Sequence, residues 1–197
     1  MTTLITWQAD GATGLEGTRL LLGAGGMRAL GRMVRADGTS AFTASYRLVV
    51  AEDGTLQRMS VSSATAERER HLTLNRTEDG YWLLDTGGEG RRSEFEGAVD
   101  ADLAFSPVFN SLPVRRLGLH RDAGEHLLKV VFVALPELTV EVVEQSYRTV
   151  STLDAGRAVV GFSSAGFESE IEFDADGVVT AYPGIARRLP EDGAAAG

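Results

Sequence analysis

The chain has no cysteine among its 197 residues. A disulfide framework, a thiolate metal site and a cysteine nucleophile are therefore excluded. The sequence also lacks any run of about 18 apolar residues, and no basic segment followed by an apolar one stands at its start. From these absences we expect a cytoplasmic protein without stable membrane insertion.

Positive charge is scarce relative to negative charge, with 19 Lys and Arg against 28 Asp and Glu and a formal net charge of −9. Phosphate binding requires a basic face that releases counterions, so the average surface argues against nucleic acid as a partner. The same deficit argues against general adhesion to anionic membranes. Both arguments concern the average surface and leave room for a local basic patch.

Histidine is also rare, and the three residues are His71, His120 and His126. If the loop before Glu125 closes a hairpin, His120 faces Glu125 and His126 lies on the opposite side of the pleat. Two histidines on opposite faces do not make a metal site. We therefore expect exposed hairpin histidines, and the sequence predicts neither a metal nor a cofactor.

Two short motifs resemble known functional motifs but do not match them. Residues 23–26 are glycine-rich, but Arg28 stands where a dinucleotide-binding loop needs its third glycine, and no βαβ pattern surrounds them. Ser163 and Ser164 lie in a segment one residue too long for a nucleophile elbow, and no helix follows them. Both segments are better interpreted as loop or turn.

What the sequence does contain is alternation with a period of two. Asp-Gly pairs recur between the alternating runs, which is typical of hairpins, and 43% of the residues are hydrophobic, as in globular proteins. The clearest run places Ile171 and Phe173 inward with Phe167 and Ser169. Its outward face is acidic: Glu168, Glu170, Glu172 and Asp174.

The pattern predicts an all-β protein with a single domain over residues 1–189 and a disordered tail over residues 190–197. About ten or more strands are expected in one antiparallel sheet. So long a sheet must curl to protect its edges, and we expect a β-roll or half-barrel. A curled sheet has a concave apolar face, which is the usual kind of ligand site.

Residues 100–117, DADLAFSPVFNSLPVRRL, are the part that fold requirements explain least. Asp100 and Asp102 point to the same side if the segment is extended. Residues 114–119 resemble a strand, which would send Arg115 and Arg116 to opposite faces. The aspartates could run acid–base chemistry, hold a hard cation, cap turns or pair with an arginine. An Arg–Asp pair inside the sheet would be a register device or a polar anchor for a ligand headgroup.

Several short motifs follow one another along the chain: Gly97-x-x-Asp100-x-Asp102, Ser106-Pro107, Asn110-Ser111-Leu112-Pro113-x-Arg115-Arg116-Leu117, Pro136-x-Leu138, Gln145-x-Tyr147 and Gly177-Val178-Val179-x-x-Tyr182-Pro183-Gly184. Together they resemble the bacterial glycolipid-binding family, once a domain of unknown function. The resemblance spans nearly the whole chain, with Phe109 and Ala98 departing from the family pattern. The resemblance implies a curled, roll-like antiparallel fold similar to half-barrel carriers of lipids and lipoproteins.

For function, the resemblance implies a non-catalytic protein that holds a glycolipid or other lipid. The concave face would take the acyl chains, and polar residues at its rim would take the headgroup. No catalytic residue is assigned. The candidate ligand-binding residues are Asp100, Asp102, Asn110, Arg115, Arg116, Gln145, Tyr147 and Tyr182.

Two alternatives stay open. One is a hydrolase acting on glycolipids or small esters through Asp100 and Asp102 with an arginine, which requires both carboxylates to line an accessible pocket. The other is a non-catalytic protein-interaction module that docks through the acidic face of residues 168–174, whose association would weaken with salt.

Overall fold

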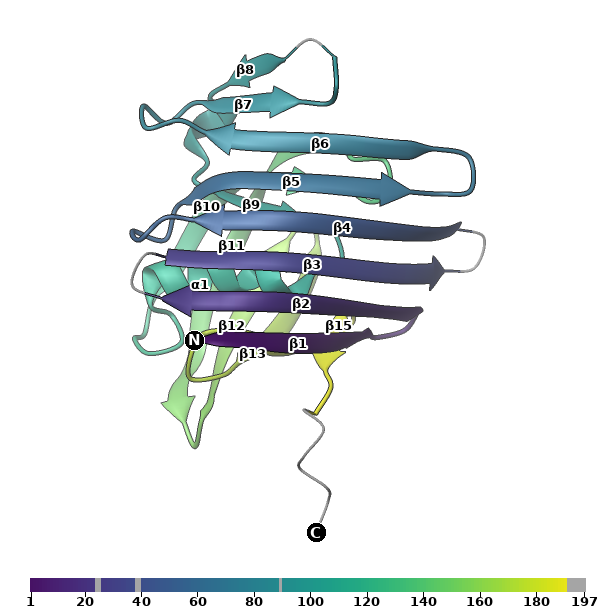
Figure 1. Cartoon of the computed structure of the whole chain (residues 1–197). Helices are drawn as coiled ribbons and strands as arrows, with labels where there is room; N and C mark the ends of the chain where they lie inside the picture. Colours follow the sequence, from purple (N-terminus) through teal and green to yellow (C-terminus); the bar gives the residue numbers. More distant parts are fainter. Residues whose placement is uncertain (24–25, 38–39, 89, 191–197) are drawn as a thin grey trace.

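The computed structural model describes residues 1–23, 26–37, 40–88 and 90–190. These residues form one sheet of 15 strands (Figure 1). The strands are β1 (Thr2–Ala9), β2 (Thr13–Gly23), β3 (Gly26–Asp37), β4 (Ser40–Val50), β5 (Leu56–Ala64), β6 (Glu69–Arg76), β7 (Trp82–Asp85), β8 (Arg91–Ser93), β9 (Asp100–Leu103), β10 (Glu125–Val133), β11 (Val140–Asp154), β12 (Arg157–Ser164), β13 (Phe167–Phe173), β14 (Val179–Tyr182) and β15 (Ala186–Arg188). The helical segments are η1 (Phe95–Gly97), η2 (Pro107–Asn110) and α1 (Ser111–Leu117).

The strand order runs from β8 back to β1 and then from β15 back to β9, so β1 and β15 meet in the middle of the sheet and β8 and β9 form its two edges. Neighbouring strands are antiparallel with one exception, because β9 runs parallel to β10. The chain leaves one edge at β8 and crosses to the other at β9, where it enters alongside β10. The predicted all-β, curled antiparallel sheet is confirmed with this one parallel pair.

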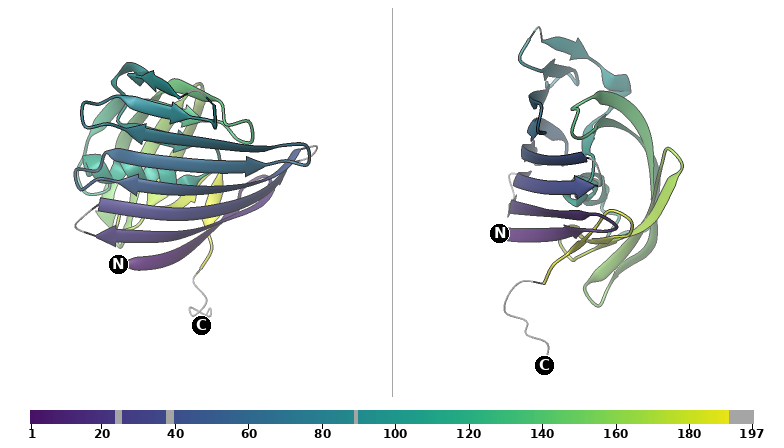
Figure 2. Two further views of the ribbon diagram at one scale, coloured as in Figure 1. Left: turned by 45° about the horizontal axis from the view of Figure 1, so that its top comes forward. Right: turned by 90° about the vertical axis from the view of Figure 1, so that its right-hand side faces the viewer.

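The sheet folds over on itself without closing. Strands β1 to β8 form one half and strands β9 to β15 the other, and the two halves face each other across the helical segments (Figure 2). We call these the first and second halves. A long sheet that folds back in this way buries one face of each half while leaving the opposite faces to solvent.

The alternation of buried and exposed residues along these strands follows the pattern expected from the sequence. On β4, the alternate residues Phe42, Ala44, Tyr46 and Leu48 are buried, while Thr43, Ser45 and Arg47 between them are exposed. On β13, Ile171 and Phe173 are buried, whereas Phe167 at the start of the strand is 39% exposed. Parts of three predicted segments, the loop at 23–26, the turn at 37–38 and the tail at 190–197, lie outside the described residues.

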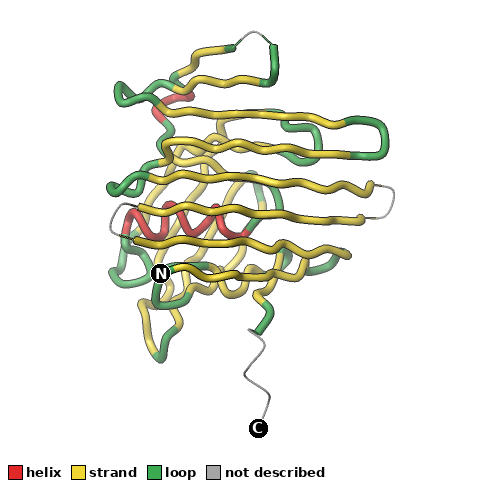
Figure 3. The backbone as a smooth tube through the Cα atoms, in the orientation of Figure 1, coloured by secondary structure: helices red, strands yellow, loops and turns green. Residues whose placement is uncertain are grey.

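The predicted strand at residues 114–119 is wrong, because Ser111–Leu117 is the helix α1 (Figure 3). Pro113 stands in its first turn, where a missing N–H costs nothing. Gly118 ends the helix with a left-handed φ of 70°, and its N–H bonds to the carbonyls of Val114 and Arg115. These are ordinary helix boundary signals, but a helix of two turns is too short to show a 3.6-residue period.

The helix and the 3-10 helix η2 before it fill the space inside the roll. Val108, Phe109 and Leu112 belong to the hydrophobic cluster with the first half, which includes Tyr46 and Leu48. Val114 belongs to a second cluster with strands of the second half, which contains Tyr147, Val160, Phe162, Ile171 and Phe173. The concave face is therefore mostly covered by the chain's own helical segment.

Two tryptophans of the first half form hydrogen bonds with other parts of the chain, one with the second half and one with the segment between β8 and β9. The indole Nε1 of Trp7 on β1 donates to the carbonyl of Val179 at 3.0 Å, and that of Trp82 on β7 donates to the carbonyl of Ala98 at 2.9 Å. Both rings are fully buried. Across the described ranges, no helix has the length and apolar character required to cross a membrane.

Gly31 on β3 lies opposite Tyr46 on β4, and a Cβ at Gly31 would lie 2.0 Å from Cζ of that ring. Gly31→Ala should therefore lower the free energy of unfolding by about 1–3 kcal/mol, because overpacking forces the tyrosine ring to move. Gly17→Ala is the matched control, since a Cβ there meets nothing within 4 Å. Urea denaturation of both variants checks this, and equal stabilities would contradict it.

Candidate functional site

One cleft of about 400 Å³ remains beside the helical segment, against the second half. Strand β9, the turn after it and the end of η2 form one wall, and strands β10 to β14 form the other. Its lining is mostly apolar: Asp102, Leu103, Ala104, Phe105, Ser106, Asn110, Phe132, Ala134, Leu135, Glu141, Val143, Gln145, Phe162, Ser164, Ala165, Phe167, Tyr182 and Ile185.

The lining residues of the cleft differ in exposure, and both Glu141 and Phe167 are exposed. Asn110 and Gln145 are each 2% exposed and Tyr182 is 6% exposed, whereas Phe167 is 39% exposed. The rings of Phe162, Phe167 and Tyr182 contact one another with centroids 5.9–6.4 Å apart. Of the predicted site residues, Asn110, Gln145 and Tyr182 are therefore buried in the base of the cleft, whereas polar residues were expected at its rim.

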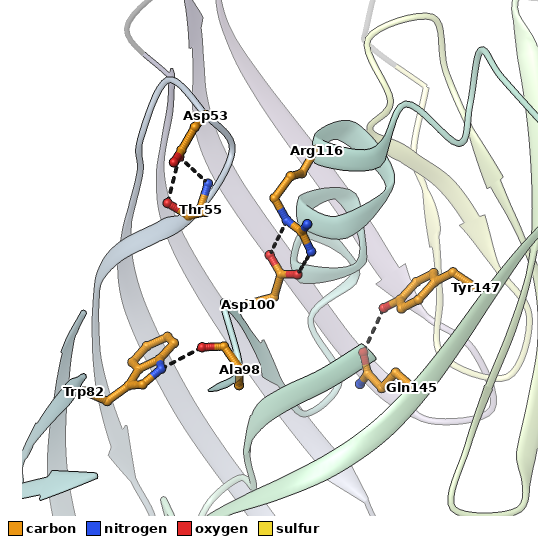
Figure 4. A network of polar contacts seen from close by, with 8 residues as sticks. All are labelled: Asp53, Thr55, Trp82, Ala98, Asp100, Arg116, Gln145 and Tyr147. Atoms are coloured by element: carbon orange, nitrogen blue, oxygen red, sulfur yellow. Dashed lines mark hydrogen bonds and ion pairs between the residues drawn. The ribbon is translucent and has the colours of Figure 1, made fainter. Parts of the chain in front are cut away.

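A chain of hydrogen bonds organises this base. Gln145 Nε2 donates to Asp102 Oδ2 at 2.7 Å, and the Tyr147 hydroxyl donates to Gln145 Oε1 at 2.8 Å. Asn110 Nδ2 in turn donates to the Tyr147 hydroxyl at 3.1 Å. The contact between Tyr147 and Gln145 is drawn in Figure 4. The chain thus links four residues of β9, η2 and β11, of which Asp102, Asn110 and Gln145 line the cleft.

Asp102 is the titratable group of the cleft base. Burial raises the pKa of its carboxyl to about 6, although the hydrogen bond from Gln145 opposes the rise. Burial also raises the pKa of Tyr182 far above neutrality, so its hydroxyl stays a hydrogen-bond donor. Among the described residues that line the cleft there is no Lys, Arg or His. Asp102 is therefore ionised above about pH 6 without a cation beside it in the cleft.

The other polar residues of the 100–117 segment lie elsewhere. Arg116 on α1 forms a bidentate ion pair with the carboxylate of Asp100 (Figure 4). Its Nη2 donates to Oδ2 at 2.5 Å, and its Nε donates to Oδ1 at 3.4 Å. The Asp100 side chain is 1% exposed and that of Arg116 is 15% exposed. Arg115 donates to the carbonyl of Asp176. The expected Arg–Asp pair exists, but it joins a helix to a strand and does not cross the sheet.

The eight predicted site residues therefore divide into three groups. Asp102, Asn110, Gln145 and Tyr182 line the cleft, and Tyr147 supports them from behind. Asp100, Arg115 and Arg116 are not among its lining residues. Because Asp100 is bound to Arg116 and Asp102 to Gln145, the two carboxylates do not share a site. The hydrolase alternative that needed both of them has no geometric support.

Sequence reasoning missed a second buried network on the side of the first half. Glu16 on β2 accepts from the hydroxyls of Tyr46 at 2.5 Å, Ser106 at 2.7 Å and Thr18 at 3.2 Å. Ser106 also lines the cleft. Burial raises the pKa of Glu16 to about 7. The signal was present in the sequence, because Glu16 and Thr18 share the inward face of their strand with Leu20.

The histidine prediction is partly wrong. His120 is buried, and both of its ring nitrogens lack a hydrogen-bond partner within the described part of the chain. Burial and the neighbouring Arg121 lower its pKa. Glu125 begins β10 and pairs with Arg148, so it does not face His120. The described residues include no group of three or more His, Asp or Glu side chains placed to hold a metal ion.

The Asp100–Arg116 pair should stabilise the fold. We expect Arg116→Met to lower the free energy of unfolding by about 3–5 kcal/mol, because it leaves a buried carboxylate without a cation. Adding Asp100→Asn to Arg116→Met should recover much of that loss, since the uncompensated charge disappears. Urea denaturation of the single and double variants measures the coupling, and additive losses would contradict a paired structural role.

Glu16 should make stability depend on pH. Its pKa in the folded chain, about 7, exceeds the ordinary 4.5, so the folded state keeps a proton that the unfolded state has lost between these values. Stability should therefore fall as pH rises through this window, by about 3 kcal/mol relative to Glu16→Gln. Denaturant midpoints at pH 4 and pH 8 test this. Parallel curves for the two proteins would refute it.

The comparisons with known proteins agree with this architecture. A DUF1089 family protein from Pseudomonas aeruginosa, known from its crystal structure, is similar with a TM-score of 0.73 and 26% identity over 93% of this chain and 95% of that chain. A β-barrel-like protein of domain of unknown function DUF1849 from Brucella abortus has a TM-score of 0.56 and 9% identity over 95% and 94% of the two chains, which shows the fold alone. No curated protein matches this chain.

A family model described as "Putative glycolipid-binding" matches residues 4–188. The match covers the described sheet from β1 to β15. It includes both the cleft and the helical segment that bounds it. The resemblance found over nearly the whole chain is thereby confirmed, and the chain belongs to the family that this model describes.

Proposed function

We propose that the cleft binds an amphiphile with an uncharged, hydroxyl-rich headgroup, such as the sugar of a glycolipid. The observation that carries this proposal is the pairing of a buried polar base with apolar walls and no cationic side chain. Sugar hydroxyls donate to Asp102 and accept from the Tyr182 hydroxyl. The aromatic rings near the mouth contact the apolar part of the ligand.

The charge of the lining favours a sugar over an anionic headgroup. Asp102 and Glu141 are its ionisable acidic residues, and neither has a basic partner within the cleft. A phosphate or fatty-acid carboxylate would meet like charge in a partly desolvated site, which is unfavourable. A neutral hydroxyl that donates to an ionised carboxylate gains a charge-assisted hydrogen bond instead.

The size of the cleft limits what it encloses. Clefts for small ligands are commonly about 300–1,000 Å³, and this one is about 400 Å³. It therefore takes one moiety of a glycolipid, with the remaining chain leaving past Phe167 at the mouth. The family description supports an amphiphilic ligand, and the cleft chemistry supports the neutral headgroup.

Isothermal titration with two probes of matched chain length tests the headgroup. We expect n-decyl glucoside to bind more tightly than decanoate at pH 8, because Asp102 is ionised there. Affinity for the glucoside should rise as pH increases through about 6, the pKa of that carboxyl. Equal or tighter binding of decanoate would overturn the proposal.

Variants separate the cleft from other acidic sites. Asp102→Asn should weaken glucoside binding about ten-fold at pH 8, where a charge-assisted bond is lost, and should remove most of the pH dependence. Glu168→Gln is the control, since Glu168 is exposed on β13 and is not a lining residue. A ligand that binds equally well to both variants does not use the base of this cleft.

A further inference from the structure

The outer face of β2 to β5 carries five exposed arginines. They are Arg19 on β2, Arg28 and Arg32 on β3, Arg47 on β4 and Arg58 on β5. We call this surface the arginine face. The outward positions described on β1 to β5 include no Asp or Glu. A chain with a net charge of −9 therefore carries a basic surface on the outer side of these five strands.

Strand register brings these arginines together. Leu30 stands opposite Arg19 on one neighbouring strand and opposite Arg47 on the other. Arg28 and Arg32 stand two residues before and after Leu30 on its own strand, so they point to the same side. Leu30 is thus surrounded by four guanidinium groups, and Arg58 extends the group diagonally from Arg47.

Nothing within the described chain neutralises this charge. The six ion pairs of the described residues involve Arg92, Arg116, Lys129, Arg157 and Arg188, and none involves the arginine face. The views in Figures 1 and 2 show no helix or strand in front of this side of β1 to β5. Like charges concentrated without partners are unfavourable on a free surface, so the face is suited to an anionic partner.

Exposed aliphatic side chains are interspersed with the arginines. Leu4, Leu15, Leu30 and Val34 are 68%, 52%, 41% and 61% exposed, and all four lie on the outward side of β1 to β3. The outward positions described on β1 to β5 include no aromatic residue. Proteins that bind single-stranded nucleic acid stack its bases on aromatic side chains, which the described part of this face lacks. A flat array of guanidinium groups and aliphatic side chains matches the phosphates and upper acyl region of a bilayer.

We propose that the arginine face docks the protein on a bilayer that contains anionic phospholipids. Guanidinium groups bind lipid phosphates in pairs of hydrogen bonds, and the aliphatic side chains enter the interface between headgroups and acyl chains. The contact is peripheral and lies apart from the cleft. The acidic remainder of the chain, including Glu168 and Glu170 on β13, is repelled by the same lipids and orients the basic side toward them.

Vesicle co-sedimentation with the whole chain tests this proposal. We expect binding to vesicles of phosphatidylcholine with 30% phosphatidylglycerol at low salt, weak binding to pure phosphatidylcholine, and loss of binding as salt is raised. Each arginine near such a surface is worth roughly a five-fold change in partitioning, so the triple variant Arg19→Gln, Arg32→Gln, Arg47→Gln should bind about a hundred-fold more weakly. Arg47→Gln alone should bind about five-fold more weakly.

The control variant removes the same charge from exposed arginines elsewhere, Arg68→Gln, Arg91→Gln and Arg148→Gln. This control variant should keep most of the vesicle binding. Asp102→Asn should keep it too, because that residue lies in the cleft, so vesicle binding and ligand binding in the cleft can be told apart. Leu4→Ser with Leu30→Ser should weaken binding without changing its salt dependence. Equal losses in the two triple variants, no preference for anionic vesicles, or tighter binding of a 30-nucleotide single-stranded DNA would each overturn the proposal.

Discussion

The segment from the end of β9 to the end of α1 has to be buried on two sides at once. Phe109 and Leu112 pack against the first half of the sheet, and Val114 packs against the second. A curled sheet that does not close leaves apolar surface on both inner faces, and covering it removes that surface from water. The cleft is the space that this segment leaves uncovered, so its position depends on how the helix is seated.

Polar groups fix the segment on each of its sides. Ser106 joins Glu16 and Tyr46 on the first half, and Asn110 joins Tyr147 and Gln145 on the second. Both networks contain a carboxyl whose pKa burial raises toward neutrality, Glu16 to about 7 and Asp102 to about 6. The two carboxyls differ in their surroundings, because Glu16 accepts hydrogen bonds from three hydroxyls of the protein whereas Asp102 lines the cleft. The same burial that holds the segment therefore makes one carboxyl structural and the other available to a ligand.

Charge is distributed unevenly over the molecule. The cleft lining has no basic residue, the outer face of β2 to β5 has five arginines, and β13 presents Glu168 and Glu170 to solvent. On β13 and its continuation, Glu172 and Asp174 are paired with Arg157 and Arg188. The average composition argued against anionic partners, and the local surface reverses that argument on one side. The net charge of the whole chain governs its long-range repulsion of other anions, whereas docking depends on the few side chains that share one face.

The sequence by itself determined most of the strands, the all-β class and the family, because a period of two is a local property and the motifs of residues 97–184 are contiguous short patterns. It also provided Asp102, Asn110, Gln145 and Tyr182 as candidate residues, and the fold brings these four to one cleft. Only the tertiary structure decided that Arg116 pairs with Asp100, that residues 111–117 form a helix, and that arginines from position 19 to 58 share one face. The ion pair and the shared face depend on register and packing between separate segments, which no local pattern records. The helix has local boundary signals, but it is too short to show its own period.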